Sequence, residues 1–182
     1  PLADRGLIEA LQDDNARYRQ HGLLREHAWD TLSPEQQIET ADRHAQGIGR
    51  AISALDDQHR FEAIDDLYPQ ALAALERAET WLSRNDDRQG AAHGQIIAVA
   101  GVLSQYWSMR GLYAAWRRWL EQTVKSAEAI EDREVEAGAL GNLGLVAMDQ
   151  GDYTAARDYH QRALELHTEL CNPLGQANAL GN

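Results

Sequence analysis

The chain reads Ala-Gly-Ala-Leu-Gly-Asn at residues 137–142 and Ala-Asn-Ala-Leu-Gly-Asn at residues 177–182, forty positions later. A second pair of segments recurs at the same spacing, because Gly-Leu-Tyr-Ala-Ala at 111–115 matches Gly-Asp-Tyr-Thr-Ala at 151–155. Self-similarity at such a period indicates stacked supersecondary units, none of which buries its apolar face alone. Since the third copy stops at Asn182, we expect a piece of a longer protein that self-associates through its open end or is only marginally stable.

The composition excludes several classes of function. Hydrophobic residues make up 43% of the 182 residues and charged residues 25%, which is ordinary for a globular protein. A formal net charge of -12 argues against direct binding to nucleic acid or to an anionic membrane surface. No apolar run approaches the roughly 20 residues of a transmembrane helix. The single Cys171 fits a reducing compartment, so we expect a cytoplasmic protein.

Helix formers dominate the sequence, and the fold class that they predict is mainly α. Residues 33–36, Ser-Pro-Glu-Gln, form a capping box with proline at the first helical position and should begin a helix. A short β-hairpin is expected before it, with its turn at 13–15. Further helices are expected at about 61–82 with an interruption near Tyr68-Pro69, and at 89–109, 112–130, 134–150, 153–170 and from 173 onward.

The repeated segment resembles a known helical motif. Leu143-Gly144 is followed seven residues later by Gly151, and then by tyrosine and small residues at Tyr153, Ala156 and Ala163. This pattern resembles the tetratricopeptide repeat in its 40-residue variety, over about residues 95–182. The resemblance implies an α-solenoid of antiparallel helix pairs. The upstream copy departs from the pattern at three positions, Ser104, Trp107 and Trp116.

Three glycines lie within one expected helix, at Gly138, Gly141 and Gly144. Each costs about 1 kcal/mol of helix stability relative to alanine. We expect the missing side chains to permit close approach of the next helix, whose Ala156 and Ala163 are also small. The alternative, a phosphate-binding loop, has little support, because no strand precedes the segment and no G-x-x-x-x-G-K-[ST] motif is present.

A second resemblance lies near the N-terminus. Residues 17–28 read Arg-Tyr-Arg-Gln-His-Gly-Leu-Leu-Arg-Glu-His-Ala. They resemble the end of the winged-helix domain in STAND-class signalling ATPases of the NB-ARC and AfsR-like type. The resemblance implies a nucleotide-sensing role for His21, although Gln20 and Gly22 replace the methionine and aspartate of the family's pattern. It also places any P-loop upstream of Pro1, so ADP or ATP would be a cofactor of the parent protein and not of this segment.

Together the two resemblances predict three parts. Residues 1–32 would be the C-terminal part of a winged-helix-like domain, residues 33–88 a helical connector, and residues 89–182 tetratricopeptide repeats. The corresponding function is a protein- or ligand-binding sensor region of a STAND-type signalling ATPase or transcriptional regulator. The alternative is a stand-alone adaptor that binds a peptide or protein partner. An enzyme is a third hypothesis, but the sequence contains no nucleophile elbow and no zinc-binding motif. It also lacks a pair of carboxylates within a fold that would shape a pocket around them.

The candidate binding residues lie on the first helix of each repeat, which lines the concave face in the tetratricopeptide family. Its asparagine, Asn142 and its counterpart Asn182, would hydrogen-bond the backbone of an extended peptide. Leu145, Met148 and Asp149 lie at neighbouring positions of that face. The alternative is that Asn142 only hydrogen-bonds a neighbouring helix.

Other residue groups have simpler interpretations. Trp107, Trp116 and Trp119 indicate core packing rather than an aromatic binding pocket. The cationic group Arg110, Arg117, Arg118 and Lys125 indicates a solvated face rather than a docking site for an acidic segment. The pairs His21/His27 and His160/His167 lack the i, i+4 spacing that places two metal ligands one turn apart on a helix face, so no metal site is expected.

Overall fold

The computed structural model describes residues 8–10, 18–20, 29–56, 61–84 and 87–181. It contains two compact units, residues 1–40 and 41–182. Helices dominate the described residues, and their arrangement is consistent with a solenoid of the tetratricopeptide kind.

In the first unit, two short segments pair antiparallel. Strand β1 (Ile8–Ala10) lies beside β2 (Tyr18–Gln20), with Glu9 opposite Arg19. The expected turn at 13–15 and the proposed sensing residue His21 lie outside the described residues. The assignment of this region to a winged-helix domain therefore stays a prediction.

The capping box forms as the sequence predicts. Helix α2 (Pro34–Asp56) begins directly after Ser33. The Gln36 backbone N–H donates to Ser33 Oγ at 3.3 Å, and the Ser33 backbone N–H donates to Gln36 Oε1 at 3.0 Å. These reciprocal bonds satisfy donors that a helix start otherwise leaves unpaired.

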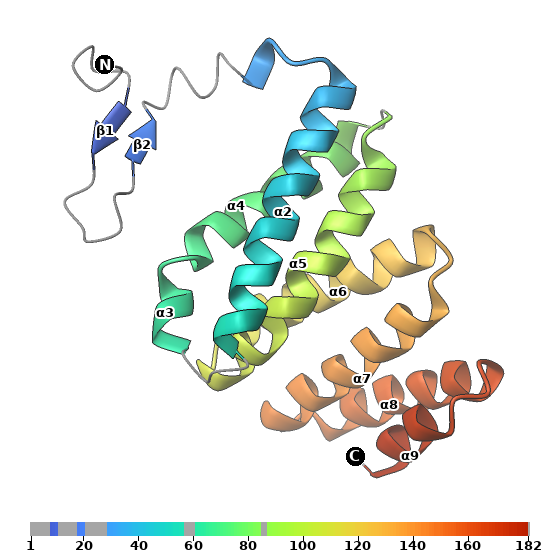
Figure 1. The fold of residues 1–182 in the computed structure, drawn as a ribbon. Helices are drawn as coiled ribbons and strands as arrows, with labels where there is room; N and C mark the ends of the chain where they lie inside the picture. The colour runs from blue at the N-terminus through green and yellow to red at the C-terminus, as the bar shows by residue number, and fades with distance from the viewer. Residues whose placement is uncertain (1–7, 11–17, 21–28, 57–60, 85–86, 182) are drawn as a thin grey trace. The chain divides into compact units, whose positions relative to one another are not determined.

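The second unit holds the repeated helices, and each helix from α4 onward packs against the next (Figure 1). The helices expected between 61 and 181, including the interruption before Pro69, are confirmed within one or two residues. They are α3 (Phe61–Asp65), α4 (Tyr68–Arg84), α5 (Gln89–Met109), α6 (Tyr113–Ala129), α7 (Arg133–Asp149), α8 (Tyr153–Glu169) and α9 (Pro173–Gly181).

One turn geometry recurs at every connection from α5 to α9 and explains the period of the repeat. The second residue after each helix end has a positive φ, namely Gly111 (66°), Glu131 (59°), Gly151 (78°) and Cys171 (51°). The next backbone N–H then closes the helix with a bond to the carbonyl five residues back, as from Asp152 to Ala147 at 2.9 Å. Helices α6, α7 and α8 each have 17 residues, and three residues separate consecutive helices. Two such helices with their turns account for the forty-residue spacing.

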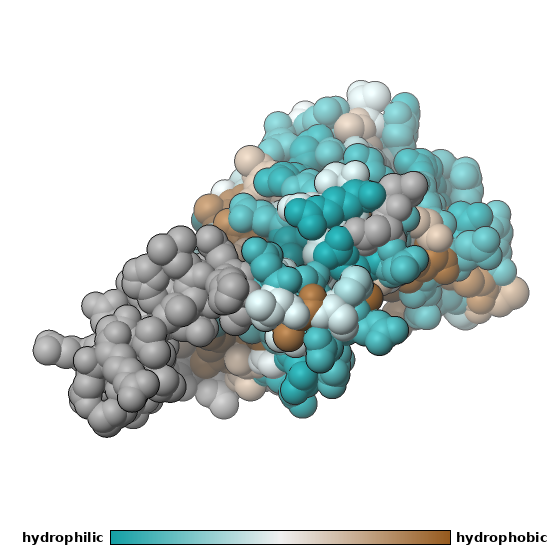
Figure 2. All heavy atoms as spheres, turned by 90° about the horizontal axis from the view of Figure 1, so that it is seen from above, coloured by the Kyte–Doolittle hydropathy of each residue, from teal (hydrophilic) through white to brown (hydrophobic). Residues whose placement is uncertain are grey.

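The core of this unit follows the lines where consecutive helices meet. Its largest fully buried side chains include Ile52, Leu75, Leu103, Trp107, Trp119 and Leu140. Hydrophilic side chains cover most of the described surface that is visible in Figure 2, with hydrophobic groups between them. Among the described residues, none of the helices combines the length and apolar character needed to cross a bilayer.

Candidate functional site

Two neighbouring hollows on the second unit share Asn142 and Leu145 of α7. The first lies among α7, α8 and α9 and has a volume of about 520 Å³. The second lies among α2, α5, α6 and α7 and has a volume of about 510 Å³. We call the two together the inner groove. Each half has the size usual for a ligand site.

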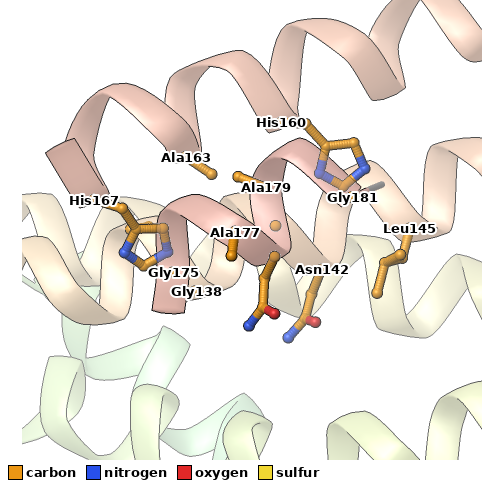
Figure 3. A pocket seen from close by; sticks show the side chains of 13 residues that line it. Gly138, Asn142, Leu145, His160, Ala163, His167, Gly175, Ala177, Ala179 and Gly181 are labelled. Atoms are coloured by element: carbon orange, nitrogen blue, oxygen red, sulfur yellow. The ribbon is translucent and has the colours of Figure 1, made fainter. Parts of the chain in front are cut away.

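The half of the groove beside α9 is shown in Figure 3. Gly138, Asn142 and Leu145 line it from α7, and His160 and His167 reach toward it from α8. Helix α9 contributes Asn178 and several small residues. This half is therefore built of amides, imidazoles, glycines and aliphatic side chains, most of them alanines.

Helix α5 contributes most of the residues that line the half beside α2. The lining of this half also contains hydroxyl and amide groups together with one thioether, one indole and one carboxylate. These residues are Ser53, Asp56, Gly101, Val102, Ser104, Gln105, Ser108, Met109 and Trp116.

Asn142 lies where the two halves meet, and its side chain is half-buried. Its amide makes no hydrogen bond to another described residue. Gln95 on α5 differs, since its amide donates to Asp42 Oδ1 at 2.7 Å. The alternative that Asn142 hydrogen-bonds a neighbouring helix thus finds no support in the described part of the protein.

The glycines of α7 do not share one role. A Cβ added to Gly144 would lie 2.4 Å from the imidazole of His160, so close packing does require glycine there. A Cβ added to Gly138 or Gly141 would meet nothing within 4 Å. The close-packing interpretation is therefore right for Gly144 and wrong for the other two, because their missing side chains face the open groove.

His160 is a nearly buried polar side chain of the groove. Only 7% of it is exposed, and neither ring nitrogen has a hydrogen-bond partner among the described residues. Burial lowers the pKa of His160, so its ring is neutral near pH 7. The ring packs over Gly144, where an added Cβ would lie 2.4 Å from it. The sequence analysis did not predict that His160 lines the groove. The sequence does show that His160 stands where the preceding repeat has Leu120, and this difference could have indicated a special role.

The tryptophans form core contacts, as the sequence predicts. Trp107, Trp116 and Trp119 are exposed by 0%, 4% and 1%, and Trp107 Nε1 donates to Tyr68 Oη at 3.2 Å. Trp116 has a second role because it also lines the inner groove, and its indole N–H lacks a partner among the described residues.

Three of the cationic residues hold helices together rather than forming a free surface. Arg110 pairs with Asp65 of α3 at 2.6 Å, and Arg118 pairs with Glu79 of α4 at 2.6 Å. Arg117 donates to the Gln150 side chain at the end of α7. The prediction of a simple solvated face is therefore incomplete for these three, because they bridge parts of the fold far apart in sequence.

The remaining candidate residues are distributed elsewhere. Met148 of α7 lines a third hollow of about 300 Å³ among α7, α8 and α9, together with Tyr153 and Leu180. Asp149 is exposed at the end of α7 and lines none of the three hollows. Asn182 lies outside the described residues. Within the described ranges, no three His, Cys, Asp or Glu side chains form a group able to hold a metal ion.

Comparison with known families identifies the C-terminal helices. A family model of the tetratricopeptide repeat matches residues 135–182, which include most of α7 and all of α8 and α9. Repeats of this class generally mediate protein–protein interaction, which supports a binding scaffold. A search among curated proteins finds no match to this sequence.

Proposed function

We propose that the inner groove binds an extended peptide segment of a protein partner. The observation that carries the proposal is the half-buried Asn142 amide, which adjoins both hollows and has no hydrogen-bond partner among the described residues. A carboxamide offers donors and an acceptor together, which matches the alternating N–H and C=O groups of a peptide backbone. Leu145 beside it supplies apolar contact.

The proposed role is binding without catalysis, metal or cofactor in this segment. The groove carries amides and small residues where an enzyme would need a nucleophile with an aligned base. A protein partner also suits the net charge of -12 better than nucleic acid does.

We further propose that this scaffold is the sensor region of a STAND-type signalling ATPase or transcriptional regulator in the cytoplasm. The support is the resemblance of residues 17–28 to a winged-helix junction, followed by a helical connector and then a tetratricopeptide repeat. Partner binding would shift the ATPase between closed and open states by favouring one of them. His21 would belong to the nucleotide-sensing part, with ADP or ATP held by upstream residues.

The alternative is a stand-alone adaptor with the same groove and no nucleotide switch. The coding sequence upstream of Pro1 separates the two proposals. A P-loop with its acidic partner strand supports the sensor, and an upstream region without them leaves the adaptor.

The groove itself is tested by selecting binders from a displayed library of random 12-residue peptides with the whole 182-residue protein as target. We expect Asn142→Ala to weaken the selected peptides by about tenfold, the effect of losing a buried hydrogen-bond pair. Gln46→Ala on the exposed surface of α2 serves as the matched amide control. Binding that survives Asn142→Ala unchanged would overturn the proposed site.

Self-association is proposed from the apolar surface of α9. Leu174 and Leu180 are exposed by 72% and 71%, whereas Leu140, the counterpart of Leu180 on α7, is fully buried. We expect light scattering to show a mass that rises with concentration and falls in Leu180→Asp. A monomeric mass at every concentration would contradict this.

A further inference from the structure

We infer that the occupant of the inner groove is an uncharged, extended segment whose backbone lies directly against the helix backbone at Gly101 and Gly141. This inference rests on the proposed function and specifies the chemistry of the partner. It follows from three observations on the groove, namely its glycines, its unpartnered polar groups and its lack of charge.

The glycines form a track along the groove. Gly101, Gly141 and Gly181 occupy equivalent positions of α5, α7 and α9, and each lines one of the two hollows. Among the described residues, and apart from the nearby backbone of the same helix, nothing lies within 4 Å of a Cβ added at any of them. Glycine within a helix is destabilising relative to alanine, and no described side chain makes use of the vacated space. That space is open to a ligand backbone, which approaches a helix most closely where side chains are absent.

Buried polar groups at the groove point independently to a ligand. His160 is only 7% exposed, and its ring, seen in Figure 3 reaching from α8 toward α9, has no partner on either nitrogen among the described residues. Trp116, with 4% exposure, lines the other half and carries an indole N–H in the same condition. Buried polar groups are normally hydrogen-bonded, so these two are fitted to a partner outside the protein. Together they offer two donors and an acceptor, which match the carbonyl and amide groups of a peptide backbone.

The groove is nearly free of charge although a quarter of all residues are charged. Apart from the imidazoles, Asp56 is the one ionisable side chain among the described residues that line either hollow. A charged side chain of the partner would lose water there without gaining an opposite charge along most of the groove. Uncharged segments are therefore favoured, with recognition by backbone hydrogen bonds and small apolar contacts.

The test uses the whole 182-residue protein and three pools of synthetic 12-residue peptides, acetylated and amidated at their ends. One pool contains only Ala, Ser, Thr, Asn, Gln and Leu, and the others carry Asp/Glu or Lys/Arg at every third position. Titration calorimetry should show the uncharged pool binding at least about tenfold more tightly than either charged pool. N-methylation of alternate backbone amides in that pool should remove binding, because it blocks backbone donors.

Variants locate the bound peptide backbone on the glycine track. Gly141→Leu should weaken the uncharged pool by about tenfold or more, while its unfolding midpoint stays equal or rises because leucine is the better helix former. Gly47→Leu, at an exposed and equally open position of α2, should raise helix stability without changing the affinity.

The outcomes separate this inference from the proposed function. If a charged pool binds best, or if Gly141→Leu binds normally while Asn142→Ala does not, the uncharged backbone track is overturned and the peptide groove stands. If no pool binds, or if binding survives both substitutions, the groove and the inference are both overturned.

Discussion

The helix pairs α5–α6 and α7–α8 share the forty-residue repeat but differ in the size of the side chains at two equivalent buried positions. In the first pair, two buried positions hold tryptophans, Trp107 and Trp116. In the second pair, the equivalent buried positions hold alanines, Ala147 and Ala156. One sequence period therefore tolerates both bulky and small side chains at these positions, with the turns at 111 and 151 kept.

The bulky pair has additional neighbours, which explains the difference. Polar side chains of α5 and α6 contact the irregular helices α3 and α4, through Tyr106 and Arg110 to Asp65 and through Arg118 to Glu79. The α7–α8 pair packs mainly against the repeat helices α6 and α9. The first pair thus works as a junction between the irregular helices and the regular repeat.

The largest expected effect on stability comes from replacing Trp107 of α5 by alanine, the residue at the equivalent position of α7. Trp107→Ala should lower the free energy of unfolding by about 3–5 kcal/mol, because it removes a fully buried indole and leaves a cavity. Chemical denaturation measures this loss. Tyr68→Phe is the control, since it removes only the acceptor of the indole N–H and should cost about 1 kcal/mol. A loss near that of the control would mean that the bulky interface is not needed.

The compact pair, α7–α8, is tested at the contact between Gly144 and His160, whose equivalents in α5–α6 are Ser104 and Leu120. Gly144→Ser, which copies Ser104, should destabilise the fold by about 1–3 kcal/mol because the His160 ring occupies the space of the new Cβ. His160→Leu copies Leu120 and should recover part of that loss. The two substitutions should couple by about 0.5 kcal/mol or more in a double-mutant cycle. Simple additivity would show that this contact does not set the helix spacing.

These comparisons show which features a sequence can predict. The helix bounds were predictable because caps and turns are local, as at Ser33, Gly111 and Gly151. The repeat fixes which helix face Asn142 and Leu145 occupy, and both line the inner groove, while their role in binding stays a prediction. The roles of Gly141, His160 and Arg118 were not, because they depend on which distant helix lies opposite, as Glu79 does for Arg118 across 39 positions.

The junction pair should respond to alkaline pH through Tyr106. Burial and the hydrogen bond to Asp65 raise the pKa of Tyr106 to about 12. An unfolded tyrosine ionises near pH 10, so the folded state retains a proton that the unfolded state loses. The stability supplied by this group is complete below about pH 10 and declines as the pH rises toward 12. In chemical denaturation at several pH values, Tyr106→Phe should be less stable than the parent at pH 8 and should approach it above pH 11. Parallel curves over this range would contradict the assignment.

The stability of the compact pair, α7–α8, should respond to acidic pH, with a smaller effect. Burial lowers the pKa of His160, so the unfolded state takes up a proton near pH 6.5 that the folded state excludes. Stability from this group is present above about pH 6.5 and declines as the pH falls below it. Because His44 and His93 have pKa values lowered in the same direction, the parent should lose stability on acidification even without His160. His160→Leu should therefore lose less stability than the parent between pH 7.5 and 5, and the difference between the two curves isolates one imidazole. Saturating groove peptide should also stabilise the parent more than it stabilises His160→Leu, because the peptide hydrogen-bonds the imidazole. This measurement links His160, which stands where α6 has Leu120, to the proposed ligand.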